Sequence, residues 1–126
     1  MDIKNISPQF TDDRGEITRL FDIPGSRIKS VLLIHSKKGS VRANHYHQHD
    51  THFAYLLSGR FEYFEKPSWE DNKISSQVID VGQLVTTMPK VIHAMKFYKD
   101  SILIVFTTEP RNQVNYEKDT IRVKLV

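Results

Sequence analysis

The stretch GSVRANHYHQHDTHFAYLLSG, residues 39–59, is the most informative part of this 126-residue chain. Four of the six histidines fall within eight residues of it: His45, His47, His49 and His52. His45 and His47 are two residues apart, so on a strand both side chains project from the same face. In a rolled-up β-sheet, a strand beginning at His52 and a later one beginning near His93 can converge on that face.

Converging imidazoles in a dry cavity repel one another if they are protonated and lack hydrogen-bond partners if they are neutral. A divalent metal resolves both problems by taking one nitrogen from each ring. Four imidazoles would complete the tetrahedral shell of zinc and leave no open position. Either the ion accepts more ligands, as manganese, iron or nickel do, or one of the four histidines stands off, with His52 the first candidate. The candidate metal ligands are His45, His47, His52 and His93.

Composition excludes several classes of protein. The chain has no cysteine, which excludes disulfide scaffolds, thiolate zinc sites, iron–sulfur clusters and cysteine nucleophiles. A net charge of +3 is too mild for a dedicated nucleic-acid binder. The longest apolar run, Ile102 to Phe106, is too short to span a bilayer, and the first residues lack the apolar region of a signal peptide. We expect one domain, residues 1–126, in the cytoplasm, without a membrane partner.

Alternating apolar residues predict many short strands and no helix. The Ser58-Gly59 turn predicts a hairpin between the strands on either side of it, and residues 30–34 are apolar enough to be buried on both faces. A strand at 121–125 is expected to close a sheet edge. Many short strands indicate an all-β sandwich or small barrel. The expected strands are 17–21, 30–34, 52–57, 60–64, 74–81, 84–87, 92–98, 102–108 and 121–125.

The histidine spacing resembles that of the cupin family. Gly39-x5-His45-x-His47-x4-His52-x6-Gly59 resembles the first cupin motif, G-x5-H-x-H-x3,4-E-x6-G, with His52 in place of glutamate. The stretch from Gly82 through Pro89 to His93 is similar to the second motif, G-x5-P-x-G-x2-H-x3-N. Its spacing differs by one residue on each side of the proline, and Val91 and Phe97 replace the glycine and the asparagine. This resemblance implies an RmlC-like cupin, a single-domain jelly-roll β-barrel.

Three further segments resemble cupins that act on nucleotide sugars. Residues 42–47, RANHYH, look like the R-G-N-H-Y-H segment in the C-terminal cupin domain of bifunctional capsular-polysaccharide enzymes. Residues 115–120, NYEKDT, are similar to the N-P-E-K-P-D-T stretch that closes that domain. Asp13-Arg14-Gly15 looks like the D-x-R-G opening shared with dTDP-4-dehydrorhamnose 3,5-epimerases and dTDP-sugar 3,4-ketoisomerases.

The two resemblances imply different roles for the histidines. Likeness to the capsular cupins implies metal ligands at the four positions named above, with zinc first among the ions. Likeness to the other two groups makes His45 or His47 a catalytic base that works without metal. Both imply an epimerase or isomerase that removes a proton from C3 or C5 of a nucleotide-linked 4-keto sugar, in surface-polysaccharide synthesis.

The remaining predicted site residues surround this chemistry. Tyr55 and Tyr63 are candidate proton donors, and Tyr98 is a candidate substrate contact. Arg42 is a candidate for binding the diphosphate, because a guanidinium matches phosphate oxygens with paired donors. Strict alternation from His45 would put Arg42 on the outer face, so that role requires a bulge or a strand that begins after Arg42.

Two other functions remain open at this point. Small four-histidine cupins include metal-dependent oxygenases, and a non-catalytic cupin that binds a sugar or a metal is the third possibility. Arg42 and Asp13-Arg14-Gly15 favour the sugar enzyme, since an oxygenase needs no diphosphate ligand. We also expect a homodimer through edge strands. Of the other histidines, His35 is expected in the core and His49 in solvent.

Overall fold

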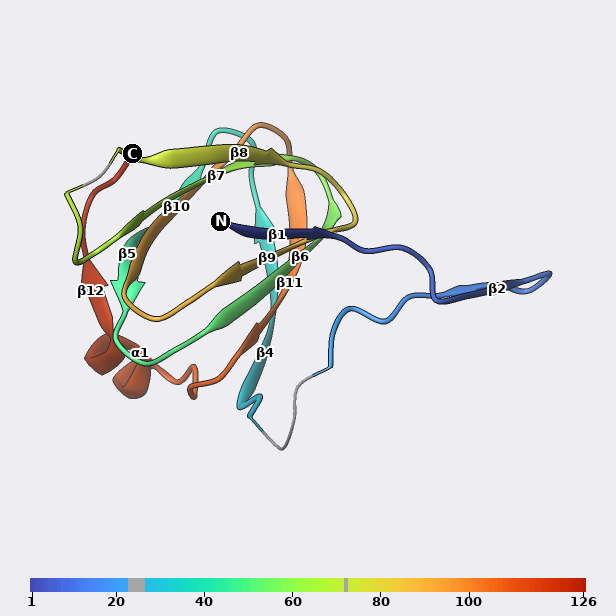
Figure 1. The fold of residues 1–126 in the computed structure, drawn as a ribbon, viewed down its shortest axis with the longest axis horizontal. Helices are drawn as coiled ribbons and strands as arrows, with labels where there is room; N and C mark the ends of the chain where they lie inside the picture. Colours follow the sequence, from blue (N-terminus) through green and yellow to red (C-terminus); the bar gives the residue numbers. More distant parts are fainter. Residues whose placement is uncertain (23–26, 72) are drawn as a thin grey trace.

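The computed structural model describes residues 1–22, 27–71 and 73–126. Two five-stranded antiparallel sheets face each other (Figure 1). The first sheet has the order β1 (Asp2–Asn5), β9 (Gln83–Thr87), β6 (His52–Ser58), β11 (Ser101–Thr107), β4 (Ser30–Ser36). The second has the order β12 (Thr120–Arg122), β5 (Val41–His47), β10 (Val91–Phe97), β7 (Phe61–Pro67), β8 (Ser75–Ile79). A small hairpin, β2 (Phe10–Asp12) and β3 (Gly15–Ile17), and one helix, α1 (Gln113–Asp119), complete the described elements.

The hydrophobic core lies between the two sheets. Alternate residues of β11 are buried, in the pattern expected for a strand with one face toward a core. Their partners come from β6 and β9 of the same sheet and from β7, β8 and β10 of the opposite sheet. The largest fully buried side chains of this core are Tyr63, Phe61, Phe97, Leu56, Ile79, Leu103 and Val85. The predicted all-β jelly roll is confirmed.

The strands β6 and β7 follow each other along the chain but do not form a hairpin. β6 pairs with β9 and β11, whereas β7 pairs with β8 and β10. The predicted hairpin through Gly59 is therefore wrong. Gly59, at φ 96°, turns the chain from one sheet to the other. A Gly-containing turn alone does not reveal this, because hairpins and sheet-crossing turns use the same left-handed residues.

The strand β4 is buried on one face only, which corrects the prediction for residues 30–34. Val31 and Leu33 are 56% and 64% exposed, because burial alternates along β4 and these two side chains point away from the core. His35 lies on the same exposed face, so the expectation of a core histidine is also wrong.

The N-terminal hairpin projects away from the two sheets (Figure 1). Its second strand ends at Ile17, so the predicted strand over residues 17–21 is wrong. Phe21 instead packs on the outer face of the first sheet, with its ring stacked on Phe53 at 4.8 Å and edge-on to Phe106 at 5.0 Å. An aromatic side chain that covers a sheet face and one that belongs to a strand give the same sequence pattern.

The helix α1 was not predicted, because seven residues are too few to show an apolar stripe. Asn112 caps it by accepting the N–H of Asn115 at 3.1 Å. β12 then forms a sheet edge as predicted, but it ends at Arg122, short of Leu125. Among the described residues, no helix is both long and apolar enough to cross a membrane.

Candidate metal and sugar-binding site

A β-bulge in β5 places the functional side chains of that strand. His45 pairs with His93 of β10, but the next pair is Ala43 with Ala94, so Asn44 has no partner in the register. Ala43 and Asn44 take left-handed φ angles of 70° and 55°. The extra residue shifts the in–out alternation of side chains along β5, so residues before the bulge point to the opposite face from the one that strict alternation predicts. As a result Arg42 lines the same pocket as His45, which the predicted diphosphate role required.

Three imidazoles meet at the inner face of the second sheet. His45, His47 and His93 are 8%, 3% and 3% exposed. The ring centroid of His45 lies 4.6 Å from that of His47 and 4.8 Å from that of His93. One ring nitrogen from each histidine lies within 4.8 Å of the others, so a single cation can bind all three. The structure thus brings together the two sequence motifs that carry these histidines.

The outer ring nitrogens of two of these histidines contact the protein. Nδ1 of His93 lies 3.0 Å from the carbonyl oxygen of Val91, and Nδ1 of His47 lies 3.2 Å from Oγ1 of Thr120. Asp119 Oδ2 is 3.6 Å from the same His47 nitrogen. Such partners orient the rings of metal-binding histidines. Nε2 of His47 is buried and has no hydrogen-bond partner among the described residues, so it can bind a cation. Nε2 of His52 is also buried without a hydrogen bond of regular geometry, although a carboxylate oxygen of Asp50 lies 2.6 Å from it.

Burial keeps these imidazoles neutral. Loss of solvent, followed by the neighbouring histidines, lowers the pKa of His45 to about 2 and that of His47 to about 3. Burial, with His52 second, lowers the pKa of His93 to about 4. Neutral imidazole is the form that binds a metal. A base with so low a pKa accepts a proton poorly at pH 7. The donor set therefore fits a divalent cation.

His52 comes from the opposite sheet and has its own partner. Its ring lies 4.5 Å from that of His47, and its Nε2 lies 2.6 Å from Oδ2 of Asp50. Asp50 is buried, and its Oδ1 accepts the N–H groups of Thr108 and Glu109 at 2.8 and 3.1 Å. Burial is the largest single effect and opposes ionisation of Asp50, but His52, His47 and the N–H of Thr108 together outweigh it and lower the pKa of this carboxyl. His47, Asp50 and His52 form a second group with cation-binding spacing.

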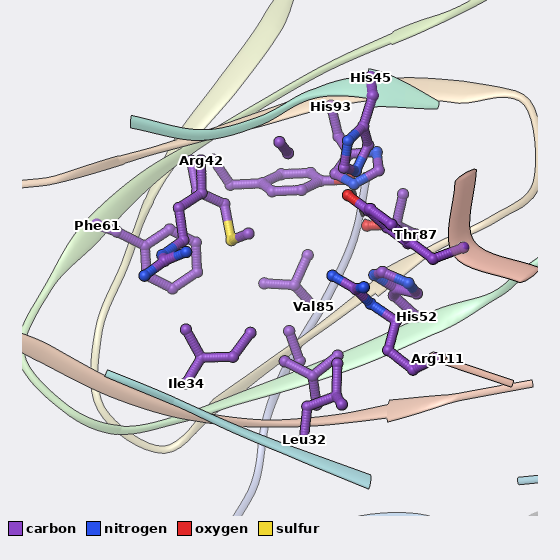
Figure 2. A pocket seen from close by; sticks show the side chains of 16 residues that line it. Leu32, Ile34, Arg42, His45, His52, Phe61, Val85, Thr87, His93 and Arg111 are labelled. Carbon is purple, nitrogen blue, oxygen red and sulfur yellow. Dashed lines mark hydrogen bonds between the residues drawn. The ribbon is translucent and has the colours of Figure 1, made fainter. Parts of the chain in front are cut away.

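The pocket beside the histidines has a polar end and an apolar end. Figure 2 shows His45, His52 and His93 near Thr87, with Arg111 beside His52 and Arg42 near Phe61. Nε of Arg42 donates to Ser36 Oγ at 2.5 Å, and its Nη2 donates to the carbonyl oxygen of His35 at 3.1 Å. The apolar side chains that line the pocket are Leu32, Ile34, Ala54, Phe61, Val85, Met95 and Val105.

Only one of the three predicted tyrosines lines this pocket. Tyr63 is 2% exposed, and its hydroxyl lies 2.7 Å from Thr87 Oγ1 and 3.1 Å from Glu65 Oε2. Burial raises its pKa, so the hydroxyl keeps its proton. Tyr55 alternates with the pocket residue Ala54 along β6 and is not part of the lining. Tyr98 lies at the surface, where its hydroxyl donates to Glu62.

Sequence reasoning missed four residues of the site. Asp50 lies inside the histidine motif, and Asp119 lies in the tail that resembles the capsular cupins. Arg111 and Tyr116 line the pocket from the segment after β11, and the centre of the Tyr116 ring lies 5.9 Å from that of His47. Of these four, Tyr116 and Asp119 lie in a stretch the resemblance marked, and Arg111 carries no sequence signal of its own.

Comparison with solved structures identifies the fold. A 3,4-ketoisomerase from Helicobacter canadensis is similar over 96% of this chain and 89% of its own, with 20% identity and a TM-score of 0.77. A mutant of the 3,4-ketoisomerase QdtA from Thermoanaerobacterium thermosaccharolyticum, in complex with TDP-4-keto-6-deoxyglucose, covers 96% of this chain and 86% of its own, with 20% identity and a TM-score of 0.75. This chain has the RmlC-like cupin fold. Epimerases of the RmlC type share it.

The chain is also similar to part of a longer protein. CapF from Staphylococcus aureus, described as a capsular polysaccharide assembling protein, matches over 95% of this chain but 34% of its own length, with 21% identity and a TM-score of 0.68. No protein-family model matches this sequence, and neither does any curated protein. The fold therefore rests on structure rather than on sequence similarity.

Proposed function

We propose that this cupin is an isomerase or epimerase of a nucleotide-linked 4-keto sugar. The observation that carries the proposal is a pocket in which buried neutral imidazoles lie beside two arginines, Arg42 and Arg111. Imidazoles suit proton transfer or metal binding, and arginines suit the diphosphate of the substrate. Structures of the same fold include a ketoisomerase bound to TDP-4-keto-6-deoxyglucose, which supports this substrate class.

The two reactions share their first step. The carbonyl at C4 acidifies the hydrogen on C3, and removing that proton leaves an enolate. Return of a proton to the opposite face of C3 completes an epimerisation. Proton transfer that places the carbonyl at C3 completes a 3,4-ketoisomerisation. The hydrogen on C5, on the other side of the C4 carbonyl, is acidified in the same way and can be removed as a proton to give the corresponding enolate.

His45, His47 and His93 are the residues that would hold a divalent cation. Zinc is our first choice, and manganese, iron and nickel are the alternatives. Three histidines leave an open position for substrate, whereas four would close a tetrahedral shell. We propose that His52 stands off because Asp50 holds its Nε2. The bound ion would supply Lewis-acid stabilisation of the developing enolate oxygen.

Within this site His52 is our candidate for moving the proton. Asp50 fixes its ring, as a carboxylate orients the imidazole of other acid–base pairs. Tyr63 is the candidate donor of a hydrogen bond to the sugar, because its hydroxyl stays protonated and can exchange its present acceptor, Glu65, for a sugar oxygen. If the site works without metal, His45 or His47 is the base instead.

The test is hydrogen exchange in heavy water. The protein is incubated with TDP-4-keto-6-deoxyglucose, and deuterium at C3 and C5 is measured by NMR. We expect uptake, and the product distinguishes a 3-keto sugar from a C3 epimer. Absence of uptake from TDP- and UDP-linked 4-keto sugars, with metal supplied, would contradict the proposal. Exchange that survives a chelator would return His45 or His47 to the role of base.

The other predicted functions are outcomes of the same test. Oxygen consumption with no exchange would favour a cupin oxygenase, and binding without either would favour a non-catalytic module. We also propose a cytoplasmic location, a role in surface-polysaccharide synthesis and a homodimer. The unpaired edge and exposed apolar residues of β4 support the dimer. A solution mass near 14.7 kDa by light scattering, the mass of one chain, would contradict it.

A further inference from the structure

Arg111 lies in the segment between β11 and α1 and points into the pocket (Figure 2). Two contacts fix its place. Its backbone N–H donates to Ser30 Oγ at 3.0 Å, and its guanidinium carbon lies 3.5 Å from the centre of the Tyr116 ring. The ring contact is a cation–π interaction, which holds the guanidinium by its face. The N–H donors lie in the guanidinium plane, so this contact leaves them free to bind an acceptor.

Arg111 has no carboxylate in direct contact among the described residues; Glu117, whose pKa is lowered first by Arg122 and also by Arg111, senses its charge from a distance. Among the described residues Arg111 makes no ion pair within 4.0 Å, and its Nε is buried without a hydrogen-bond partner. Other arginines do have partners, such as Arg60 with Asp80 at 2.9 Å and Arg122 with Glu117 at 2.9 Å. A buried donor without an acceptor costs free energy, and a bound anion removes that cost.

Arg42, the arginine that the sequence singles out, is less free to bind an anion. Its Nε and Nη2 already donate to Ser36 Oγ and to the carbonyl oxygen of His35. In Figure 2 it lies near Phe61, apart from Arg111 and His52. The free donors therefore lie beside the histidines, at the α1 end of the pocket.

We infer that Arg111, held on Tyr116, binds a phosphate of the nucleoside diphosphate in the substrate. This inference rests on the proposed function, because it takes its ligand from that substrate class. Phosphate matches the fork of N–H donors in pairs and carries permanent charge, whereas the enolate oxygen is charged only during the reaction. Arg111 is then a substrate-binding residue, and Tyr116 positions it.

The test compares TDP with thymidine, which has the same base and sugar without phosphates. Binding of each is measured by calorimetry to the wild type and to Arg111→Gln. Loss of a charged hydrogen bond predicts about tenfold to hundredfold weaker binding of TDP. We expect thymidine binding to be unchanged. Arg60→Gln is the matched control, since it removes an equal charge from the turn between β6 and β7, outside the pocket, and we expect it to bind TDP normally.

Variants at Tyr116 test the positioning. Tyr116→Phe keeps the ring and should bind TDP like the wild type, whereas Tyr116→Ala should weaken TDP and not thymidine. Circular dichroism and thermal melting verify that each variant is folded. Arg111→Lys should restore part of the affinity, because it keeps the charge without the paired donors.

Three outcomes would overturn the inference. They are a wild type that binds neither TDP nor UDP, an Arg111→Gln protein that binds TDP normally, and equal losses for TDP and thymidine. The failure of the proposed function is separate. If the wild type binds TDP through Arg111 but introduces no deuterium into 4-keto sugars, the Arg111 assignment stands and the proposed isomerase or epimerase function is refuted. Exchange lost in Arg111→Gln with TDP affinity intact refutes this assignment alone.

Discussion

The three buried histidines differ from the exposed ones in what surrounds their ring nitrogens. His47 and His93 have one nitrogen held by the protein and the other directed toward the shared site. His35 and His49 are exposed, as the sequence predicted for His49 but not for His35. The candidate cation site therefore depends on burial and orientation, not on histidine content.

Replacing His93 with alanine should abolish tight metal binding. The substitution removes one of three ligands, and two imidazoles hold a divalent ion far more weakly. We expect stoichiometric zinc in the wild type after dialysis against zinc and a loss of most of it in His93→Ala, measured by mass spectrometry of the metal. His49→Ala is the control, since His49 is exposed and outside both groups with cation-binding spacing. Equal zinc in the two variants would refute the ligand assignment.

The metal-free protein should lose stability as the pH falls below about 6.5. The folded-state pKa values of His45, His47 and His93 lie between about 2 and 4, below the unfolded value of roughly 6.5. In this window the unfolded chain binds more protons, so the free energy of unfolding rises with pH and falls on acidification. Each histidine contributes up to about 1.4 kcal/mol per pH unit.

Urea unfolding of chelator-treated protein at pH 5.5, 6.5 and 7.5 measures this dependence. His93→Phe should reduce the slope, because it removes one of the three titrating groups. His35→Ala should leave it unchanged. A free energy of unfolding that does not vary across this range would show that the histidines are solvated.

At the scale of elements, the bulge in β5 decides which side chains reach the pocket. Ala43 takes a φ angle of 70°, a conformation that costs a residue with a Cβ about 1 kcal/mol or more. The R-G-N-H-Y-H segment that this stretch resembles has glycine at that position. Asn44, the bulge residue without a partner on β10, contacts the last residues of the chain. Its Oδ1 accepts the N–H groups of Leu125 and Val126 at 2.8 and 3.0 Å.

Ala43→Gly should stabilise the protein by roughly 0.5–1 kcal/mol, since relief of the left-handed strain exceeds the entropy that glycine adds to the unfolded chain. Ala54→Gly, in regular strand β6, should destabilise it. Thermal and urea unfolding measure both. If Ala43→Gly is as destabilising as Ala54→Gly, position 43 is not strained.

At the scale of the whole molecule, the core and the site are separable. Leu103→Ala should lower the free energy of unfolding by about 2–5 kcal/mol, because Leu103 is fully buried in the central cluster between the sheets. Val78→Ala, at an exposed position, should change it by less than about 0.5 kcal/mol. Urea unfolding measures both, and folded Leu103→Ala should keep its zinc. Loss of zinc at temperatures where the variant is folded would show that the core positions the histidines directly.

The pattern of alternating residues predicted where the strands lie but not how they pair. Alternation located most strands within a few residues, because side chains of a strand alternate whether or not its partners are known. It could not tell that β6 and β7 belong to different sheets, that β4 is an edge strand or that Phe21 covers a sheet face. Those facts depend on which strands pair, and pairing joins residues that are distant in the chain.

The histidine spacing, the absence of cysteine and the strand alternation were enough for the cupin fold and for three histidines of the site. Local chemistry fixes these features, since residues two apart on a strand must share a face. Only the folded chain showed that Asp50 lies against His52, that a bulge turns Arg42 inward, that Tyr55 lies outside the pocket and that Arg111 rests on Tyr116 with no ion pair among the described residues. Each of these depends on contacts between separate strands or on a one-residue change of register, and neither is encoded by spacing along the sequence.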